Sequence, residues 1–288
     1  MLYPQGYCAG VKNAINIAKS SRENYPNNPI YILGYLVHNK QVIDSFEQLD
    51  IKTLYSNNGD YTDIIKQLED DAVIIFPAHG HDEKYDEIAK DKGLIILDAV
   101  CPKVKQNSSI IKKELNEGHQ VIYIGIGKHP ETAASLSLGD NVLLFDIYKE
   151  FDYSSVKDDS PLVINQTTLN YLELTNVHND IKNHIPNARF QNEICNSTRT
   201  RQERIVNLDK DVDMIVIVGD KASSNTNRLV EIAKSSHPNA RCLLVSNINQ
   251  LDKNEIVNKK HIVISSGAST PTETINMIYE EIINSFAK

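Results

Sequence analysis

One stretch indicates the fold most directly: Leu94-Ile95-Ile96-Leu97-Asp98-Ala99-Val100-Cys101-Pro102. Its four consecutive apolar residues are typical of a strand that is buried on both faces of a parallel sheet. Proline is favoured in the first turn of a helix, and residues 103–117 carry apolar side chains at helical spacing. The stretch therefore predicts a strand, a short loop, and a helix that begins at a cysteine.

The same pattern recurs along the whole chain. Short, continuous apolar runs alternate with segments of helical periodicity, which predicts an α/β protein with mainly parallel sheets. The predicted strands are residues 30–37, 72–77, 94–98, 121–126, 142–145, 161–165, 214–218, 241–246 and 261–265. The predicted helices are residues 103–117, 169–184, 223–236 and 272–286.

Three of the four cysteines are evenly spaced. Cys8 precedes Cys101 by 93 positions, and Cys101 precedes Cys195 by 94. Such a repeat predicts three similar α/β lobes, each of which supplies one ligand to a common centre. We expect lobes at residues 9–100, 101–192 and 193–288, with residues 1–8 packed on the third. Cys242 lies inside an apolar run, so we expect a small buried hydrophobic side chain there.

The composition excludes some classes of function. Of the 288 residues, 41% are hydrophobic and 24% are charged, and the net charge of −8 argues against a nucleic-acid binder. The N-terminus lacks the features of a signal peptide, and no apolar run approaches the ~20 residues of a membrane helix. We therefore expect a cytoplasmic protein with no membrane partner. Disulfides are rare in that compartment, so the cysteines are expected to be ligands or nucleophiles.

The cysteine pattern favours an iron–sulfur cluster as the shared metal centre. Thiolates are the usual cluster ligands, whereas structural zinc normally shows close C-x2-C pairs, which are absent from this sequence. Three thiolates on a four-iron cluster leave one iron without a protein ligand. A three-cysteine zinc site remains the competing metal centre.

Polar side chains follow several predicted strands at the point where each one ends. His38, His79 and His129 occupy such positions, and Glu131 follows His129 by two residues. Open α/β sheets bind ligands at this edge. Imidazoles can donate hydrogen bonds to phosphate oxygens, and Glu131 can relay protons in a dry pocket.

Hydroxyl-rich turns also follow strands, at residues 166–168, 219–228 and 265–271. A helix N-terminus with hydroxyl and amide groups forms an anion site, although the same serines can be ordinary N-caps. Two or more such turns suit a diphosphate better than a single carboxylate. The candidate anion ligands in these turns are Thr167, Thr168, Ser223, Ser224, Asn225, Asn227 and Ser269.

Two familiar motifs are incomplete. Gly125-Ile126-Gly127 ends a predicted strand, but Pro130 stands where a dinucleotide-binding motif has its third glycine, so electrons should come from a separate protein. Cys195 and Arg201 have the Cys-x5-Arg spacing of cysteine phosphatases. Residues 196–200, however, contain no glycine to shape a phosphate cradle, and that function leaves Cys8 and Cys101 unexplained.

Several short motifs occur in order along the chain: Gly6-Tyr7-Cys8-Ala9-Gly10-Val11, Val37-His38-Asn39, Ala78-His79-Gly80, Asp98-Ala99-Val100-Cys101-Pro102, His129-Pro130-Glu131, Gln166-Thr167-Thr168, Ile194-Cys195 with Thr198 and Arg201-Gln202, Ser223-Ser224-Asn225, and Gly267-Ala268-Ser269. This series resembles the LytB family of 4-hydroxy-3-methylbut-2-enyl diphosphate reductases, over nearly the whole chain. Four features depart from the family pattern: the first strand is short, Val100 replaces a threonine, residues 132–134 replace a glycine pattern, and Asn196 stands where an aromatic is common.

The resemblance implies three α/β lobes in a pseudo-threefold trefoil around one 4Fe–4S cluster, held by Cys8, Cys101 and Cys195. It implies reductive removal of the substrate hydroxyl as water, which gives isopentenyl and dimethylallyl diphosphate in the non-mevalonate pathway. An external donor such as ferredoxin or flavodoxin would supply the electrons. Glu131 would deliver the proton, with Thr167 and His129 beside it. The substrate-binding set would be His38, His79, His129, Thr167, Thr168, Ser223, Ser224, Asn225, Asn227 and Ser269.

Three alternatives remain open from the sequence. Another three-cysteine 4Fe–4S enzyme, resembling quinolinate synthase, would share the lobes and the cluster. A cysteine phosphatase that uses Cys195 and Arg201 would hold no iron. A cluster-based redox sensor should bring a DNA-binding helical module and a basic face, and neither is evident in the sequence.

Overall fold

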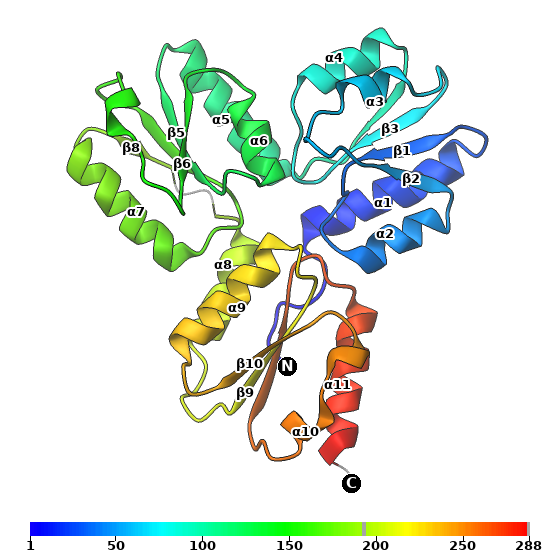
Figure 1. Ribbon diagram of the computed structural model, residues 1–288, viewed down its shortest axis with the longest axis vertical. Helices are drawn as coiled ribbons and strands as arrows, with labels where there is room; N and C mark the ends of the chain where they lie inside the picture. Colours follow the sequence, from blue (N-terminus) through cyan, green and yellow to red (C-terminus); the bar gives the residue numbers. More distant parts are fainter. Residues whose placement is uncertain (192–193, 287–288) are drawn as a thin grey trace. The chain divides into compact units, whose positions relative to one another are not determined.

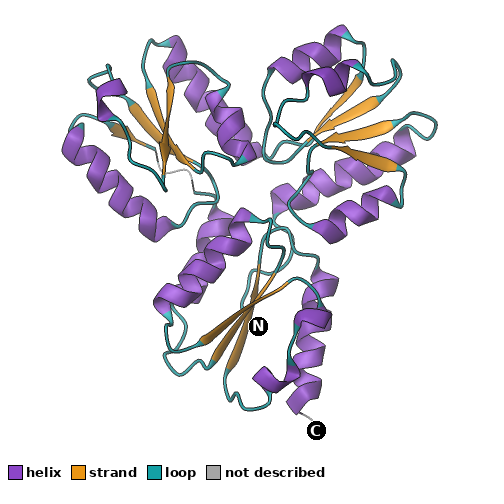
Figure 2. Ribbon diagram, in the orientation of Figure 1, coloured by secondary structure: helices purple, strands orange, loops and turns teal. Residues whose placement is uncertain are grey.

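The computed structural model describes residues 1–191 and 194–286, which form three parallel β-sheets flanked by helices (Figures 1 and 2). Every strand pair within these residues is parallel. The predicted α/β class with three similar parallel-sheet lobes is confirmed.

The first sheet has the strand order β2-β1-β3-β4. Figure 1 shows α1 and α2 on one face and α3 and α4 on the other. Alternate residues of β1 and β3, such as Tyr31 and Phe76, pack toward α3 and α4. Because helices cover both faces of the sheet, both strands are apolar throughout. The elements are α1 Ala9–Asn24, β1 Ile30–Leu33, α2 Lys40–Glu47, β2 Ile51–Leu54, α3 Thr62–Lys66, β3 Val73–Phe76, α4 Lys84–Asp91 and β4 Ile95–Asp98.

The second sheet has the order β6-β5-β7-β8. Ile122 and Ile124 of β5 pack toward α7, whereas Val121 and Tyr123 belong to the core on the side of α5. The elements are α5 Pro102–Asn116, β5 Val121–Gly125, α6 Pro130–Leu136, β6 Val142–Asp146, η1 Tyr153–Ser155, β7 Leu162–Asn165, α7 Tyr171–His184 and β8 Arg189–Phe190.

The third sheet has the order β10-β9-β11. Val216 of β9 packs with residues of α11, and Ile217 packs with residues of α8 and α9. The elements are α8 Asn196–Val206, β9 Met214–Val218, α9 Ser224–Ser236, β10 Arg241–Val245, η2 Ile248–Gln250, α10 Lys253–Ile256, β11 Ile262–Ser266 and α11 Thr272–Phe286.

The N-terminal segment lies beside β11. The N–H of Leu2 donates to the carbonyl of Ile264 at 2.8 Å, and the N–H of Cys8 donates to the carbonyl of Ala268 at 3.0 Å. Residues 1–8 therefore occupy the position beside β11 that β4 occupies beside β3 and β8 occupies beside β7.

The three cysteines share one topological position as a result. Cys101 follows β4, Cys195 follows β8, and Cys8 ends the N-terminal segment beside β11. Each is followed at once by a helix, respectively α5, α8 and α1. Each of the three cysteines thus stands where a helix begins, as predicted for Cys101.

The predicted strands are all present, with ends that differ by a few residues. The sequence analysis missed β2 and β8, which are edge strands with polar or exposed residues and therefore lack a continuous apolar run. Cys242 packs against the core of the third lobe but is only half-buried, because β10 is an edge strand. The prediction that the side chain of Cys242 is buried was therefore wrong.

The chain divides into two compact units. Unit 1 comprises Met1–Val11, His38–Val42 and Cys195–Lys288 and contains the third sheet. Unit 2 comprises Lys12–Val37 and Ile43–Ile194 and contains the first two sheets. Among the described residues, no helix combines the length and the apolar character that crossing a bilayer requires. The boundaries of the three predicted lobes stay a prediction.

Candidate functional site

The predicted site residues follow the central pair of strands in each sheet. In every sheet the first strand along the chain lies in the middle, the second pairs on one side of it and the third on the other. The second and third strands therefore lie on opposite sides of the first, so the strand order reverses between the first and third strands. Open α/β sheets bind ligands at the point where the strand order reverses. His38 and His79 follow β1 and β3, Glu131 and Thr167 follow β5 and β7, and Ser223 and Ser269 follow β9 and β11.

In unit 2, His129 and Glu131 are set by the start of α6. Pro130 occupies the first turn of the helix, where its missing N–H costs nothing. His129 is the N-cap, and its Nδ1 accepts a hydrogen bond of 3.2 Å from the N–H of Glu131. The bond assigns the proton of a neutral imidazole to Nε2, which leaves that nitrogen as a donor.

The Glu131 carboxyl group is held mainly by Thr167, 36 positions further along the chain. The N–H of Thr167 donates to Oε1 and its Oγ1 donates to Oε2, each at 2.8 Å. The hydroxyl of Tyr123 lies 3.5 Å from Oε1 and makes a weak third contact. Parallel pairing of β5 with β7 brings these side chains together, because the carboxyl ends of parallel strands lie at one edge.

Burial changes the acid–base behaviour of Glu131. The residue is 3% exposed, and desolvation of the ionised form raises the pKa of its carboxyl group from 4.5 to about 7. The hydrogen bonds from Thr167 and Tyr123 favour the ionised form and act in the opposite direction. A carboxyl group with this pKa is poised to give up a proton at neutral pH.

Gln166 keeps Thr167 in place. Its side-chain Oε1 accepts hydrogen bonds from the N–H of Ile126 at 3.1 Å and from Oγ1 of Thr132 at 3.3 Å. Its Nε2 donates to Oγ1 of Thr168 at 2.8 Å. Thr132, at a position that departs from the family pattern, therefore supports the same turn that carries Thr167.

His79 and Cys101 are connected through the backbone of unit 2. The N–H of Cys101 donates to the carbonyl of Ala78 at 2.9 Å, directly before His79. Gly80 ends that turn with a φ of +88°, and a Cβ there would lie 3.3 Å from side-chain atoms of Val104 and Ala134. Glycine is therefore required for both conformation and space.

In unit 1, Cys8 and Cys195 lie near the same buried guanidinium. Arg201 is 2% exposed, and its Nη2 donates to the carbonyl of Gly6 at 2.7 Å. Its Nη1 donates to the carbonyl of Ser197 at 3.1 Å and also to the Ser197 hydroxyl. Burial lowers the pKa of Arg201, whereas the charges of Cys8 and Cys195 raise it.

The loops after β9 and β11 converge in unit 1. Oγ of Ser269 lies 3.4 Å from Oγ of Ser223 and donates to the carbonyl of His38 at 3.3 Å. Ser223 caps α9 by accepting from the N–H of Thr226 at 3.4 Å. The pKa of His38 is lowered, mainly by burial, against the opposing charge of Asp220. A neutral imidazole and two hydroxyls thus lie at the N-terminus of a helix.

The asparagines of the same turn bind protein groups. Oδ1 of Asn225 accepts from the N–H of Ala268 at 3.1 Å, and its Nδ2 donates to Oγ1 of Thr198 at 3.1 Å. Nδ2 of Asn227 donates to the carbonyl of Lys221 at 2.9 Å. Ser224, the first residue of α9, is partly buried. Asn225, in the first turn of α9, therefore joins the first turn of α8 to the loop that precedes α11.

The structure brings part of the predicted site together within each unit. Unit 2 joins His129, Glu131, Thr167 and Thr168 through the contacts above, and unit 1 joins His38, Ser223, Asn225 and Ser269. The predicted cluster ligands are divided: Cys8 and Cys195 belong to unit 1 and Cys101 to unit 2. Within either unit, the described residues contain no group of three metal-binding side chains.

The three cysteines themselves suit thiolate chemistry. Each is a half-buried residue outside any disulfide, at the start of a helix. In unit 1, the guanidinium of Arg201 adds a positive charge near two of them, and its Nε is buried with no hydrogen-bond partner among the described residues. A buried donor of this kind near cysteine side chains fits an iron–sulfur cluster, because the cluster's sulfurs accept hydrogen bonds.

The phosphatase alternative does not fit. Residues 196–200 form the first turns of α8, and the N–H groups of Thr198 and Arg199 bond back to the carbonyl of Cys195. The guanidinium of Arg201 already donates hydrogen bonds to the carbonyls of Gly6 and Ser197. A phosphate cradle needs backbone N–H groups that converge on an open space around the thiolate.

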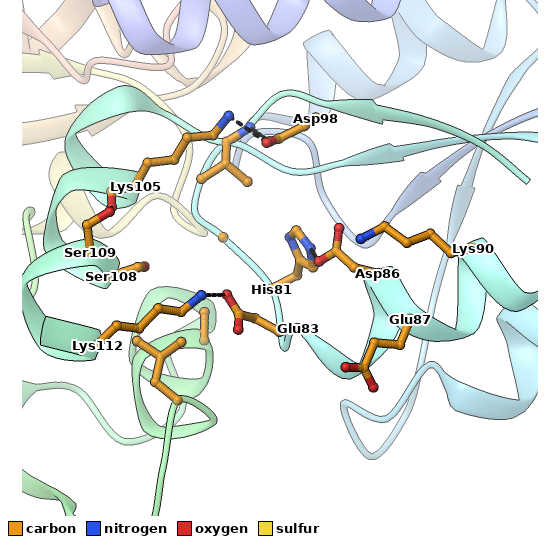
Figure 3. A pocket seen from close by; sticks show the side chains of 14 residues that line it. His81, Glu83, Asp86, Glu87, Lys90, Asp98, Lys105, Ser108, Ser109 and Lys112 are labelled. Carbon is orange, nitrogen blue, oxygen red and sulfur yellow. Dashed lines mark hydrogen bonds and ion pairs between the residues drawn. The ribbon is translucent and has the colours of Figure 1, made fainter. Parts of the chain in front are cut away.

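A cavity of about 530 Å³ lies beside α4, α5 and α6 of unit 2 (Figure 3). Three pairs of its charged groups lie against each other: Lys105 with Asp98 at 2.5 Å, Lys112 with Glu83, and the imidazole of His81 with Asp86 at 2.7 Å. None of the predicted site residues lines it.

Several functional contacts were missed in the sequence. Tyr123 beside Glu131 had one detectable signal, a single hydroxyl inside the apolar run 121–126. Thr132 gave none, because its bond to Gln166 joins positions that are 34 apart in the chain.

Comparison with known proteins agrees with the site. A family model described as LytB protein matches residues 1–283. The 4-hydroxy-3-methylbut-2-enyl diphosphate reductase of Malacoplasma penetrans (strain HF-2) is 34% identical over 281 residues, which cover 96% of this chain and 93% of that protein. The reductase of the same name from Lysinibacillus sphaericus (strain C3-41) is 36% identical over 279 residues, covering 96% and 84%.

Solved structures are similar over the same length. The E-1-hydroxy-2-methyl-but-2-enyl-4-diphosphate reductase from Plasmodium falciparum matches with a TM-score of 0.85 and 26% identity, over 97% of this chain and 86% of that one. A second structure, described as (E)-4-hydroxy-3-methyl-but-2-enyl diphosphate reductase, the terminal enzyme of the non-mevalonate pathway, matches with a TM-score of 0.69 and 27% identity, over 97% and 96%.

Proposed function

Because the chain belongs to the LytB family, we propose that it is an oxidoreductase that converts 4-hydroxy-3-methylbut-2-enyl diphosphate to isopentenyl and dimethylallyl diphosphate. The observation that carries the reaction is the buried carboxyl group of Glu131, held by Thr167 at two points with a pKa of about 7. Removal of a hydroxyl group as water needs such a proton donor.

Membership in the family implies an iron–sulfur cluster. We propose one 4Fe–4S cluster per chain, held by Cys8, Cys101 and Cys195. When bound, the cluster supplies electrons to the substrate. The equivalent positions of the three cysteines, each before a helix, support this ligand set.

Glu131 has the role of general acid in this proposal. Thr167 keeps the carboxyl group in one orientation through its N–H and Oγ1. Burial keeps a large fraction of Glu131 protonated near neutral pH, and it excludes water that would take up the proton. His129 is fixed in place by the hydrogen bond that its Nδ1 accepts from the N–H of Glu131.

The loops after β9 and β11 are proposed to bind the diphosphate. The hydroxyls of Ser223, Ser224 and Ser269 and the N-terminus of α9 offer donors to phosphate oxygens. We assign His38, His79, His129, Thr167 and Thr168 to the same ligand. Asn225 and Asn227 order these loops, since their amides bind protein groups.

The partners follow from the same chemistry. We propose ferredoxin or flavodoxin as the electron donor, an allylic diphosphate as the substrate, and the cytoplasm as the compartment. Neither a nucleic acid nor a membrane has a role in this function.

The test is anaerobic purification with iron and sulfide analysis, followed by addition of the hydroxylated allylic diphosphate and a chemical reductant. We expect about four irons per chain and C5 diphosphate products. Iron without turnover would favour another cluster enzyme, such as one resembling quinolinate synthase. A protein that cannot be loaded with iron would refute the proposal.

Cysteine variants test the ligand set separately. Cys8→Ser, Cys101→Ser and Cys195→Ser should each lower the iron content. Cys242→Ser is the matched control, because Cys242 lies in β10 of the third lobe and should leave the iron content unchanged. Full iron in any of the first three variants would remove that cysteine from the set.

A further inference from the structure

Arg201 is a buried charged residue with no role in the proposed reaction. Its side chain comes from the second turn of α8 and is among the largest fully buried ones in the described part of the chain. A guanidinium remains protonated in proteins, so a full positive charge lies inside unit 1. A buried charge is costly unless it has partners.

The partners of Arg201 connect two cysteine-bearing segments. Nη2 binds the carbonyl of Gly6, two residues before Cys8, at 2.7 Å. Nη1 binds the carbonyl of Ser197, two residues after Cys195, at 3.1 Å. One planar group thus bonds to both segments, and a planar guanidinium holds such bonds in a fixed geometry.

The Gly6 side of this connection is itself firmly placed. The N–H of Gly6 donates to Oγ of Ser266 at 3.0 Å, and the N–H of Cys8 donates to the carbonyl of Ala268. Gly6 has a φ of +65°, and a Cβ there would lie 2.7 Å from Oγ1 of Thr272. The segment that leads to Cys8 therefore has little freedom to move away from Arg201.

The set of bonds around Arg201 is incomplete. Nε is buried without a hydrogen-bond partner among the described residues, whereas both Nη atoms are bonded. The two Nη bonds reach segments that lie within two residues of Cys8 and Cys195. A buried donor without a partner among the described residues, on a cation that binds both cysteine segments, indicates an anionic sulfur group as the missing partner.

We propose that Arg201 is a positioning residue for the cluster: it fixes the Cys8 and Cys195 segments to each other, and its charge and unused N–H favour the reduced cluster. The inference rests on the proposed function, because it requires that the cluster binds. It goes beyond that function, since it assigns cluster retention and reduction potential to a residue that binds neither iron nor substrate.

Two effects follow from this role, and they are separable. Hydrogen bonds to cluster sulfurs and nearby positive charge raise the reduction potential, because they stabilise the added electron. Connection of the two segments keeps the thiolates in place and slows loss of iron. Arg201→Gln removes both the charge and the planar guanidinium group. Arg201→Lys keeps the charge but removes the planar guanidinium group.

The experiment uses the holoprotein, loaded anaerobically. The reduced fraction of the cluster is measured by electron paramagnetic resonance at poised solution potentials, and iron loss is followed with a ferrous chelator. Arg204→Gln is the matched control, because Arg204 lies one turn's length along α8 and is exposed. Circular dichroism of each variant checks the fold.

In Arg201→Gln, we expect about a tenfold fall in the ratio of reduced to oxidised cluster at a fixed potential, which equals ~59 mV for one electron. We also expect several-fold faster iron loss. Arg201→Lys should keep a reduced fraction near that of the wild type while it loses iron faster. Arg204→Gln should match the wild type in both measurements.

A wild-type potential in Arg201→Gln would overturn the electronic role, and wild-type iron loss in both Arg201 variants would overturn the positioning role. If Arg201→Gln fails to fold, Arg201→Lys decides: faster iron loss at an unchanged potential supports the inference, and wild-type behaviour in iron loss refutes it. A wild-type protein that binds no cluster would instead refute the proposed function.

Discussion

Replacement of Glu131 by glutamine should change how the stability of the protein depends on pH. Glutamine has the shape of a protonated glutamic acid but cannot ionise. Its amide can still accept the N–H of Thr167, and the Thr167 hydroxyl can turn to accept from the amide. At low pH the variant and the wild type should therefore be similarly stable.

The magnitude follows from the pKa of the buried carboxyl group. In the folded chain it is about 7, against 4.5 in an unfolded one. Because the folded state holds this proton more tightly, the proton stabilises the folded state. The contribution is complete below the pKa of the unfolded chain and is lost as the pH rises through the pKa of the folded chain. The difference between 4.5 and about 7 corresponds to ~3 kcal/mol.

The assay is urea unfolding of the cluster-free protein, followed by circular dichroism between pH 4.5 and pH 8.5. The free energy of unfolding of Glu131→Gln, minus that of the wild type, should rise by ~3 kcal/mol over this range. Glu150→Gln, at an exposed position, is the control and should show no such rise. In the holoprotein, Glu131→Gln should keep its iron and lose turnover.

Parallel pH profiles for Glu131→Gln and the wild type would refute this reasoning. They would mean that the Glu131 carboxyl group ionises in the folded protein as easily as in the unfolded chain. Burial would then not hold a proton on Glu131, and its assignment as the general acid would lose its physical basis.

Other substitutions test the surroundings of the same residues. Thr167→Val removes one donor to the Glu131 carboxylate, a bond of about 1.5–3 kcal/mol. The high-pH limb of kcat/KM should therefore move up by about one to two pH units, and an unchanged limb would contradict the assignment. Tyr123→Phe removes only the 3.5 Å contact and should move that limb by less than Thr167→Val does. Asn225→Ala leaves the Ala268 N–H unpaired, so it should lower the free energy of unfolding by about 2 kcal/mol and raise KM at constant iron content; an unchanged KM would separate Asn225 from the diphosphate loops.

Much of the fold could be predicted because the central strands are apolar throughout. Residues 214–218 and 121–126 are buried on both faces of parallel sheets, and that burial is visible as an uninterrupted apolar run. Edge strands lack this signal: β2 has two polar residues, Lys52 and Thr53, in its middle, and both residues of β8 are exposed. Their position depends on pairing with a neighbour, which a local pattern does not encode.

The candidate site was predictable in its residues but not in its contacts. Glu131 and Thr167 were recognisable as polar groups at strand ends, yet their two bonds depend on the pairing of β5 with β7. Arg201 looked like half of a phosphatase motif, and only the fold shows that its guanidinium binds Gly6, 195 positions away.

By itself the sequence determined the α/β class, the repeat of three cysteines and the chemical types available for catalysis, because apolar runs, spacing and side-chain chemistry are properties of the chain alone. The tertiary structure decided the state of those groups. Burial gives Glu131 its pKa of about 7, and the carbonyl of Gly6, 195 positions away, binds the guanidinium of Arg201. Desolvation and hydrogen bonding act over a few ångströms in space, so they depend on which remote segments the fold brings into contact.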